Sequence, residues 1–352
     1  MIILRGTTDY KVIDYSIEEK IGEYKICKIK TLASYFYNFL NENKRLYLIK
    51  NNKIVFIGII DTMDYNFEEG VLSLVLYDYI VSIKYKNDLL GDAPSYVVTY
   101  SASLSDNILS DILSGTEFTM EYCPSQSIDS ITGDRLDRSE WLMLLKQNIT
   151  CGLDINGNYT TNASNIVSDE QEVDILTNYT DMTVTMGVAG CYRESKTSEV
   201  WKKLKLKIDD YIDKIDELQY NIHDYKRIIV VGKNDVYGSA YLYSALDLPV
   251  KVIVDTSCET STACVKKANT ELNKIYKEKT IGLTVKPELY YNNEIQLGMS
   301  VVTERPIIIG EYTVTEIKAT STSVSLTLGR PKKRFITSLY DIEKRVSKME
   351  KW

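Results

Sequence analysis

The chain has 352 residues, of which 44% are hydrophobic and 26% are charged, and these proportions are ordinary for a globular protein of about two to four domains. Its net charge of −7 is spread along the chain without a basic block, which argues against a nucleic-acid partner. No stretch reaches the roughly 18 apolar residues of a membrane span, and the first apolar run is too short for a signal peptide. We therefore expect the chain to fold in the cytoplasm.

Tyrosine and cysteine are the two residue types whose use is informative. The chain has 27 Tyr against 6 Phe, which either suits half-buried sheets and protein interfaces or reflects a general compositional bias. The cysteines stand singly, without a CxxC pair, so we expect buried free thiols, with a Cys258–Cys264 bridge as the alternative. The six are Cys27, Cys123, Cys151, Cys191, Cys258 and Cys264.

Residues 1–90 have the pattern of a strand-rich domain. In "RLYLIKNNKIVFIGIID" two apolar runs flank Asn51 and Asn52, residues that tolerate positive φ, and this predicts a hairpin with a two-residue turn. The following "VLSLVLYD" alternates with a period of two and predicts a third strand. Residues 31–43, ahead of the hairpin, predict a short helix or an irregular connection.

Residues 91–165 predict a small α+β domain. "SDNILSDILSG" carries apolar residues at helical spacing, and "RSEWLMLLKQNI" predicts a second short helix with Ser139 as its N-cap. "LDINGNYTT" then predicts a hairpin that turns at Asn156-Gly157.

Residues 166–227 predict a polar linker followed by a charged helix. In the charged segment, apolar residues follow one another at spacings of three and four over about three and a half heptads, the pattern of an amphipathic helix. Its apolar seam would pack on a sheet within the chain or form a coiled coil between chains. Because "KLKLKI" also alternates with a period of two, a strand over these first residues is the third alternative. The seam residues are Trp201, Leu204, Ile208, Tyr211, Ile215, Leu218, Ile222 and Tyr225.

Residues 228–335 return to β-structure and contain six strand-like segments with one helical segment, "STACVKKANTELNKIYKEK", among them. In "EYTVTEIKA" the alternation changes phase at Ile317, which predicts a β-bulge or a bend. The chain ends in residues 336–352 with an amphipathic helical pattern.

The sequence offers little for catalysis. His223 is the single histidine, so a histidine-rich metal cluster is impossible, and its position in the charged segment does not indicate a catalytic role. "VVGKNDVYGSA" is not a phosphate-binding loop, because Gly232 and Gly238 are one residue too far apart and no lysine follows. We assign no catalytic, metal-binding or cofactor-binding residue and expect no cofactor.

Three segments resemble the tail hub, or baseplate hub, proteins of tailed phages and related contractile injection particles. The first is the hairpin region with Phe56, Gly58 and Ile60, and the second is "GDRLDRSEWLMLLKQNITCGLDINGNYTT". The third runs from "ACVKKANTELNKIYKEK" to "SVSLTLGR". It carries Ala268, Leu272, Ile295, Gly298, Val301, Gly310, Tyr312 and Val314.

The resemblance implies a β-rich, multidomain α+β fold with two small antiparallel β-barrel-like modules, similar to tail-tube modules. They would occupy residues 1–95 and 228–335, with the α+β domain at 96–165, the linker and charged helix at 166–227, and the terminal helix at 336–352. It implies a non-enzymatic homotrimer at the virion or particle tail tip that contacts tail-tube, spike or fibre and tape-measure proteins. The alternatives are a receptor- or glycan-binding tail-tip protein and a tail-associated cell-wall hydrolase.

Overall fold

The structure is a computed structural model and describes residues 2–40, 45–66, 68–85, 97–134, 136–156, 158–162, 165–166, 168–171, 173–193, 195, 198–220, 227–241, 250–276 and 279–329. The chain divides into two compact units, Met1–Lys214 with Leu283–Leu328 and Ile215–Gly282 with Gly329–Trp352. The division falls inside two strands, β18 (Ile212–Tyr220) and β22 (Lys279–Val285).

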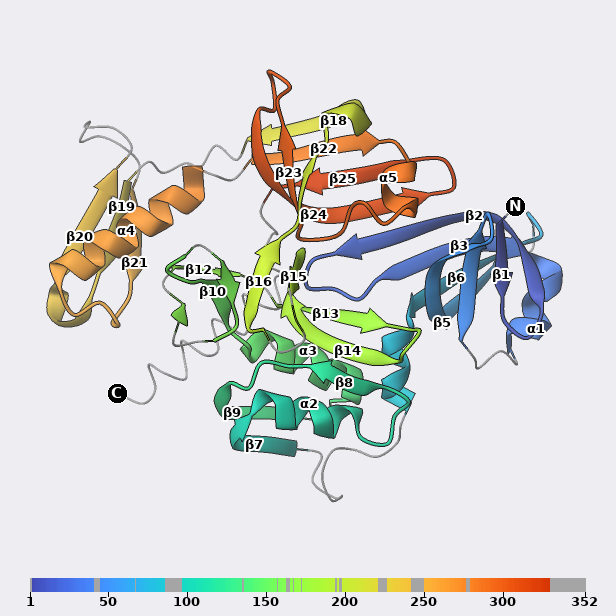
Figure 1. Ribbon diagram of the computed structural model, residues 1–352, viewed down its shortest axis with the longest axis horizontal. Helices are drawn as coiled ribbons and strands as arrows, with labels where there is room; N and C mark the ends of the chain where they lie inside the picture. Colours follow the sequence, from blue (N-terminus) through green and yellow to red (C-terminus); the bar gives the residue numbers. More distant parts are fainter. Residues whose placement is uncertain are drawn as a thin grey trace. The chain divides into compact units, whose positions relative to one another are not determined.

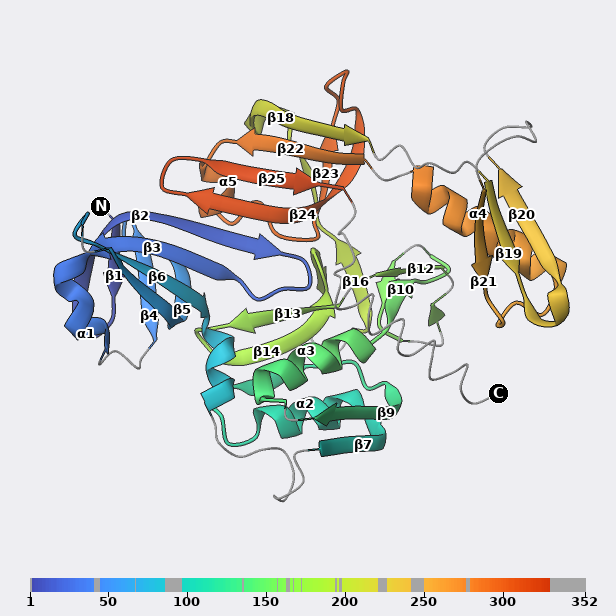
Figure 2. The same ribbon diagram turned by 180° about the vertical axis from the view of Figure 1, so that it is seen from behind.

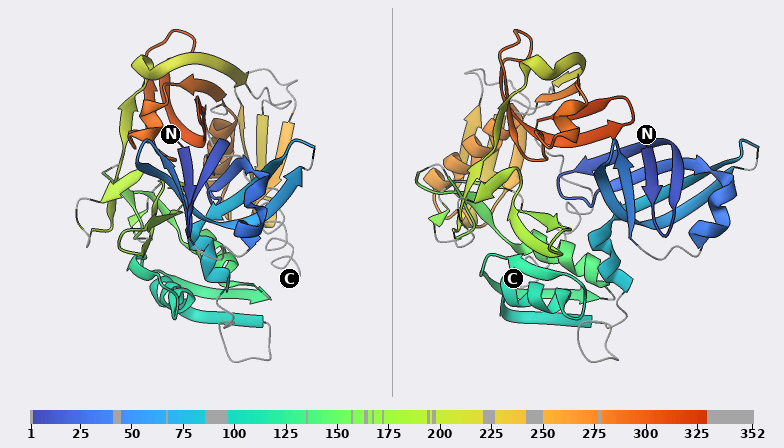
Figure 3. Two further views of the ribbon diagram at one scale, coloured as in Figure 1. Left: turned by 90° about the vertical axis from the view of Figure 1, so that its right-hand side faces the viewer. Right: turned by 45° about the vertical axis from the view of Figure 1, so that its right-hand side comes forward.

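The N-terminal part of the first unit is a closed antiparallel barrel of six strands in the order β1-β4-β5-β6-β3-β2, with β1 paired to β2 (Figures 1 and 3). A 3₁₀ turn, η1 (Ala33–Tyr35), and helix α1 (Phe36–Leu40) connect β3 to β4. The strands are β1 (Ile2–Arg5), β2 (Asp9–Lys20), β3 (Ile26–Leu32), β4 (Leu46–Lys50), β5 (Lys53–Asn66) and β6 (Val71–Asp78).

The local sequence explains the barrel's central hairpin. Asn51 and Asn52 adopt φ values of 50° and 64°, as the predicted two-residue turn between β4 and β5 requires. Leu72, Leu74 and Leu76 are each at most 1% exposed, so the alternating pattern of β6 fills the barrel interior. A Cβ on Gly58 would lie 2.4 Å from the carbonyl oxygen of Tyr77, so this position needs glycine.

A middle domain follows, built on one core that includes Trp141, Leu142, Leu145, Ile108 and Ile112. Its strands form a β7-β9 pair, a β13-β14-β8 sheet and a β12-β10-β11-β16-β15 sheet. The helical elements are η2 (Tyr79–Tyr85), α2 (Ser105–Leu113) and α3 (Arg138–Asn148). The strands are β7 (Val97–Leu104), β8 (Thr119–Tyr122), β9 (Ser127–Asp134), β10 (Cys151–Leu153), β11 (Tyr159–Thr160), β12 (Ser168–Gln171), β13 (Val173–Asn178), β14 (Thr183–Val188), β15 (Cys191–Arg193) and β16 (Val200–Lys203).

Both predicted helices of the middle domain are present, but Ser139 is not the N-cap of α3. The cap is Asp137, whose side chain accepts hydrogen bonds from the backbone N–H groups of Ser139 and Glu140. The Glu140 carboxylate accepts from the backbone N–H of Asp137, which completes a capping box. Because Asp-x-x-Glu forms this box as Ser-x-x-Glu does, the N-cap lies two residues before the predicted one.

A second module pairs β17 (Lys205–Lys207), β18, β22, β23 (Ser300–Thr303), β24 (Gly310–Thr320) and β25 (Val324–Leu328) in the order β17-β23-β24-β25-β22-β18. The short turn η4 (Asp209–Tyr211) joins β17 to β18, and helix α5 (Glu288–Tyr291) lies between β22 and β23. The predicted bulge is present in β24, where the register with β25 shifts between Val314 and Glu316.

The two modules repeat one topology. Numbered along the chain within each module, both sets of strands have the spatial order first, fourth, fifth, sixth, third, second. Both have a helical element between the third and fourth strands, and both have a bulge in the fifth strand, near Asp61 in β5 and Thr315 in β24. One difference is that β1 runs antiparallel to β4, whereas β17 runs parallel to β23.

Between β18 and β22 the chain forms a small subdomain. Its sheet has the order β20-β19-β21, and α4 (Ser261–Tyr276) lies along one face of it (Figures 1 and 2). Ile228, Val230 and Ala268 contribute to its core, and Cys258 and Cys264 are buried there as free thiols, without the alternative bridge. The remaining elements are β19 (Arg227–Val231), η5 (Lys233–Asp235), β20 (Tyr237–Tyr241) and β21 (Val250–Val254).

These pairings give the second module other bounds than the expected 228–335. The sheet begins at residue 205, upstream of that range, while β19, β20 and β21 pair with one another in a separate sheet. The six strands predicted over 228–335 are nevertheless all present as β19, β21, β22, β23, β24 and β25. The terminal helix predicted over 336–352 lies outside the described residues.

The charged helix predicted over 201–225 is wrong. This stretch forms β16, β17, the η4 turn and β18, and Ile222, His223 and Tyr225 lie outside the described residues. The two-residue alternation in "KLKLKI", the third alternative, predicted a strand here, and Leu206 in β17 does align with Val301 of β23. In β18, Ile212 is buried and Ile215 and Leu218 are partly buried, and because they stand three apart they cannot all lie on one face of the strand.

Candidate functional site

The joint between the repeated modules is a strand pair. Beyond its contact with β1, β2 continues and pairs antiparallel with β24, residue by residue from Ser16↔Thr320 to Lys20↔Glu316 (Figure 1). Ion pairs cross the joint, Lys20 to Glu316 at 3.3 Å and Lys318 to Glu18 at 3.6 Å. This pairing merges the two modules into one continuous sheet.

Helix α5 reinforces the joint through Tyr291. The hydroxyls of Tyr291 and Tyr15 lie 2.5 Å apart, and the Tyr291 hydroxyl donates to the carbonyl of Thr320 at 2.6 Å. The ammonium of Lys50 lies 3.9 Å from the centre of the Tyr291 ring and donates to the carbonyl of Ser321 at 2.9 Å. One aromatic side chain thus connects β2, β4 and the β24–β25 turn.

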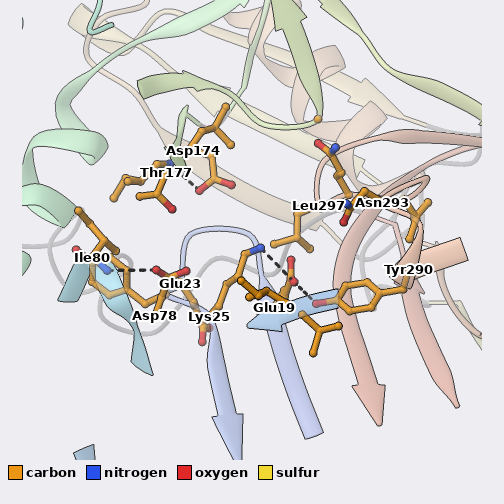
Figure 4. Close-up of a pocket in the computed structure, with 18 of the residues that line it drawn as sticks. Glu19, Glu23, Lys25, Asp78, Ile80, Asp174, Thr177, Tyr290, Asn293 and Leu297 are labelled. Atoms are coloured by element: carbon orange, nitrogen blue, oxygen red, sulfur yellow. Dashed lines mark hydrogen bonds and ion pairs between the residues drawn. The ribbon is translucent and has the colours of Figure 1, made fainter. Parts of the chain in front are cut away.

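A cavity of about 590 Å³ lies beside this joint, within the first unit. Its wall combines the end of β2 and the β2–β3 turn with residues of α3, β13 and α5 and of the segment that follows α5 (Figure 4). The polar side chains that line it include Glu19, Lys25, Asp78, Lys146, Asp174 and Tyr290.

Most of these charged groups are paired with one another. Lys25 lies 3.2 Å from the Glu19 carboxylate, which also accepts a hydrogen bond of 2.5 Å from the Tyr290 hydroxyl, and both interactions are drawn in Figure 4. Glu19 itself is only 5% exposed. On the opposite wall, Lys146 and Asp174 form an ion pair of 2.9 Å.

Asp78 is the carboxyl group of the cavity with a strongly shifted pKa. Burial raises the pKa of Asp78 to about 6, while Lys25 and a hydrogen bond from the backbone N–H of Ile80 act in the opposite direction. The nearby carboxylates of Glu19 and Asp174 raise it further. A raised carboxyl pKa is a property of many active sites, but structural ion-pair networks produce it as well.

The geometry of the cavity favours a structural role over a chemical one. Glu19 and Asp174 are already paired with lysine side chains of the same chain. The Tyr24 hydroxyl donates to the carbonyl of Ser139 at 2.7 Å, and burial raises its pKa well above the usual value. In the part of the chain that the structure describes, no three His, Cys, Asp or Glu side chains are grouped to hold a metal ion. Among these residues no helix is long and apolar enough to cross a membrane.

The predicted seam residues that the structure describes do not form one surface. Trp201 is buried in the core of the middle domain, where its ring takes the space that a side chain on Gly187 would need. Leu204 follows β16, and Ile208, with 0% exposure, precedes η4 in the second module. Sequence reasoning also missed Glu19, Asp78 and Tyr290, because they lie far apart in the chain and belong to no recognisable motif.

No protein-family model matches the chain, and no curated protein matches it. Solved structures do. The 43 kDa tail protein of prophage MuSo2 from Shewanella oneidensis is 12% identical with a TM-score of 0.60, and the alignment covers 94% of this chain and 98% of that one. The chain has the fold of phage tail proteins. A tail protein from Neisseria meningitidis MC58 is also 12% identical, with a TM-score of 0.51 over 94% of this chain and 96% of that one.

The tail-protein fold confirms the resemblance first seen in three segments of the sequence, and with it the β-rich multidomain class. Two of the glycines that carried the resemblance have structural reasons. Gly58 permits the close approach of β5 to β6, and Gly298, with φ of 78°, packs against the backbone of Ala189 in the middle domain. Both glycines therefore act on packing within the tail-protein fold.

Proposed function

We propose that this chain is the structural hub of a phage-like tail or contractile injection particle. In this proposal three copies form a ring at the tail tip that joins the tail tube to a spike or fibre and has no catalytic turnover. The neighbours along the axis are the tail tube protein, the spike or fibre and the tape-measure protein. Assembly takes place in the host cytoplasm before the particle is complete.

The repeated module is the observation that carries the proposal. A chain with two modules of one topology, joined edge to edge by β2 and β24, presents two similar units side by side. Three such chains in a closed ring present six similar units to one neighbour while keeping three-fold symmetry for another. An adaptor between a six-fold tube and a three-fold spike needs this combination.

The chemistry of the cavity supports a structural role over the alternative of receptor or glycan binding. Such a site would be an aromatic cleft with converging carboxylates and amides, and the cavity does contain Tyr290, Glu19, Asn292 and Asn293. However, Glu19 is occupied by Lys25 and Tyr290, so it already has partners within the chain. Binding a sugar there would first have to break these interactions.

Multi-angle light scattering of the purified chain, followed by imaging of assembled particles, tests the proposal. We expect a trimer in solution, or three copies per particle at the junction of tube and tip. A monomer in solution together with a copy number that is not a multiple of three in the particle contradicts the ring. Lysis of purified cell walls by the chain alone would instead support the hydrolase alternative.

A further inference from the structure

Within the chain, helix α5 of the second module is a contact surface for the first module. Its Tyr291 ring lies 3.9 Å from the ammonium of Lys50 at the end of β4. Asn292, directly after the helix, accepts a hydrogen bond of 3.4 Å from Lys53 at the start of β5. The turn between the fourth and fifth strands of one module therefore meets the helical element between the third and fourth strands of the other.

The repeated topology gives each of these two elements a counterpart. The counterpart of α5 is α1 in the first module, and the counterpart of the β4–β5 turn is the loop between β23 and β24 in the second module, residues 304–309. Two modules that alternate around a ring meet at two kinds of joint, one within each chain and one between chains. A joint between chains that repeats the one within the chain brings α1 and the 304–309 loop together.

Both counterparts carry exposed apolar side chains. In α1, Tyr37 and Leu40 are 76% and 49% exposed, and at a spacing of three they lie on one face of the helix. In the 304–309 loop, Ile307 and Ile309 are 65% and 64% exposed. In α5, by contrast, Tyr291 is only partly exposed, because it packs on the first module. The exposure of these side chains distinguishes α1 and the loop from the two elements that meet within the chain.

The exposure of the two isoleucines is built into the loop. Between them, Ile308 is fully buried, and its backbone N–H donates to the carbonyl of Arg305 at 2.9 Å. The Arg305 guanidinium in turn donates to the carbonyls of Asp209 and Ile212, each at 2.9 Å. The loop is thus anchored to the second module and holds the side chains on either side of Ile308 in solvent. Covering such apolar surface with a partner is favourable.

We infer that the 304–309 loop of one copy packs Ile307 and Ile309 against Tyr37 and Leu40 on α1 of the next copy. The inference rests on the proposed ring and gives it an apolar contact. Because the loop and α1 are different surfaces, the contact is heterologous, and it continues from copy to copy until the ring closes. The partner is a second copy because the chain already joins the equivalent two elements of its own modules.

Charged substitutions on each surface test the contact. Leu40→Glu and Ile309→Lys each place a charge in an apolar contact, so each single variant is expected to need roughly tenfold more protein than the parent to assemble, measured by light scattering over a dilution series. A chain with both changes brings opposite charges together and is expected to recover most of this loss. Ile155→Glu is the matched control, because Ile155 is 87% exposed but lies in the middle domain, and it should assemble like the parent.

Particles supply the readout if the free chain is a monomer. Each variant then replaces the parent during particle assembly, and mass spectrometry measures its amount in purified particles. We expect each single variant to be depleted roughly tenfold and the double variant to be restored. Because the substituted side chains are exposed, all variants should keep the thermal unfolding temperature of the parent under dilute conditions.

The outcomes separate this contact from the ring itself. Single variants that assemble as the parent does overturn the contact and leave the ring standing. Folded single variants that keep the trimer but are lost from particles, or that the double variant does not rescue, assign the two surfaces to another tail protein and also overturn the contact. A chain that is monomeric in solution and not present in threes in particles overturns both.

Discussion

Gly190 and Gly298 approach backbone to backbone: a Cβ on Gly190 would lie 2.0 Å from the carbonyl carbon of Gly298. Both residues have positive φ, 65° and 78°. Gly190 lies in the turn between β14 and β15 of the middle domain, and Gly298 lies in the turn before β23 of the second module. This contact sets the distance between these two parts of the first unit. Gly298, which lies in a segment that resembles the hub proteins, is therefore required for packing.

Gly298→Ala is therefore expected to destabilise the chain through two effects. A positive φ costs a residue with a side chain about 1–2 kcal/mol, and the new methyl group would lie 2.4 Å from the carbonyl carbon of Ala189. We expect a total loss of about 3 kcal/mol in the free energy of unfolding, measured by urea denaturation. Gly70→Ala is the matched control, because Gly70 has φ of 63° but no atom near its Cβ position. Equal losses in the two variants would show that the contact with Ala189 does not matter.

Tyr290→Phe tests the hydrogen bond that closes the cavity on the α5 side. The Tyr290 hydroxyl donates to the buried Glu19 carboxylate at 2.5 Å, and bonds to charged groups contribute about 1.5–3 kcal/mol. We expect a loss of this size in the free energy of unfolding. Tyr211→Phe removes an exposed bond of 2.9 Å to Glu294 and should cost much less. A loss for Tyr290→Phe no larger than for this control would assign the stability of the joint to other contacts.

Asp78 predicts a specific dependence of stability on pH. The pKa of Asp78 is raised from 3.8 to about 6 by burial, so between these values the folded chain keeps a proton that the unfolded chain has lost. This contribution is full below about pH 4 and is lost as the pH rises through about 6, an effect of about 2–3 kcal/mol. Asp78→Asn cannot ionise, so its free energy of unfolding should exceed that of the parent at pH 8 by about 2–3 kcal/mol and approach it at pH 4.

Urea titrations at several pH values measure this difference. Asp9→Asn is the control, since the hydrogen bond from Arg5 lowers the pKa of Asp9, and the variant should therefore not gain stability at high pH. A difference between Asp78→Asn and the parent that does not change from pH 4 to pH 8 would contradict the shift.

Local patterns predicted most individual elements correctly. The hairpin at Asn51–Asn52, both helices of the middle domain and the bulge before Ile317 depend on residues close together in the chain, and the sequence contains those residues. The seam from Trp201 to Tyr225 misled because apolar residues at spacings of three and four also arise when short strands follow one another with turns between them. Neither secondary-structure propensity nor the spacing of apolar residues shows which side chains each apolar residue packs against in the folded chain.

The repeat and the cavity could not be predicted, for a different reason. The order of the strands in a sheet depends on contacts between residues far apart, such as Ser16 with Thr320, and no local pattern records them. The same is true of Glu19 and Tyr290, which are 271 positions apart and meet only because β2 crosses to the second module. The subdomain inserted between β18 and β22 further separates strands that belong to one sheet.

Arg138 gives a last prediction, within the middle domain. Its Nη1 group donates to the carbonyls of Asp111, Ile112 and Ser114 at 3.1, 2.6 and 2.9 Å, so it satisfies groups that the end of α2 leaves without helical partners. The side chain is 7% exposed, and its positive charge also matches the negative end of the helix dipole. Arg138→Met keeps the aliphatic bulk but removes this donor from the buried Ile112 carbonyl and from the Ser114 carbonyl, whereas the Asp111 carbonyl still accepts from the backbone N–H of Ser114 at 3.2 Å. We expect a loss of about 1–3 kcal/mol in the free energy of unfolding, the cost of leaving one buried carbonyl unsatisfied. Arg5→Met, which removes an exposed ion pair with Asp9 at 2.7 Å, is expected to leave the free energy of unfolding nearly unchanged, because solvent screens exposed pairs. If both variants unfold at the same urea concentration, Arg138 does not hold the end of α2.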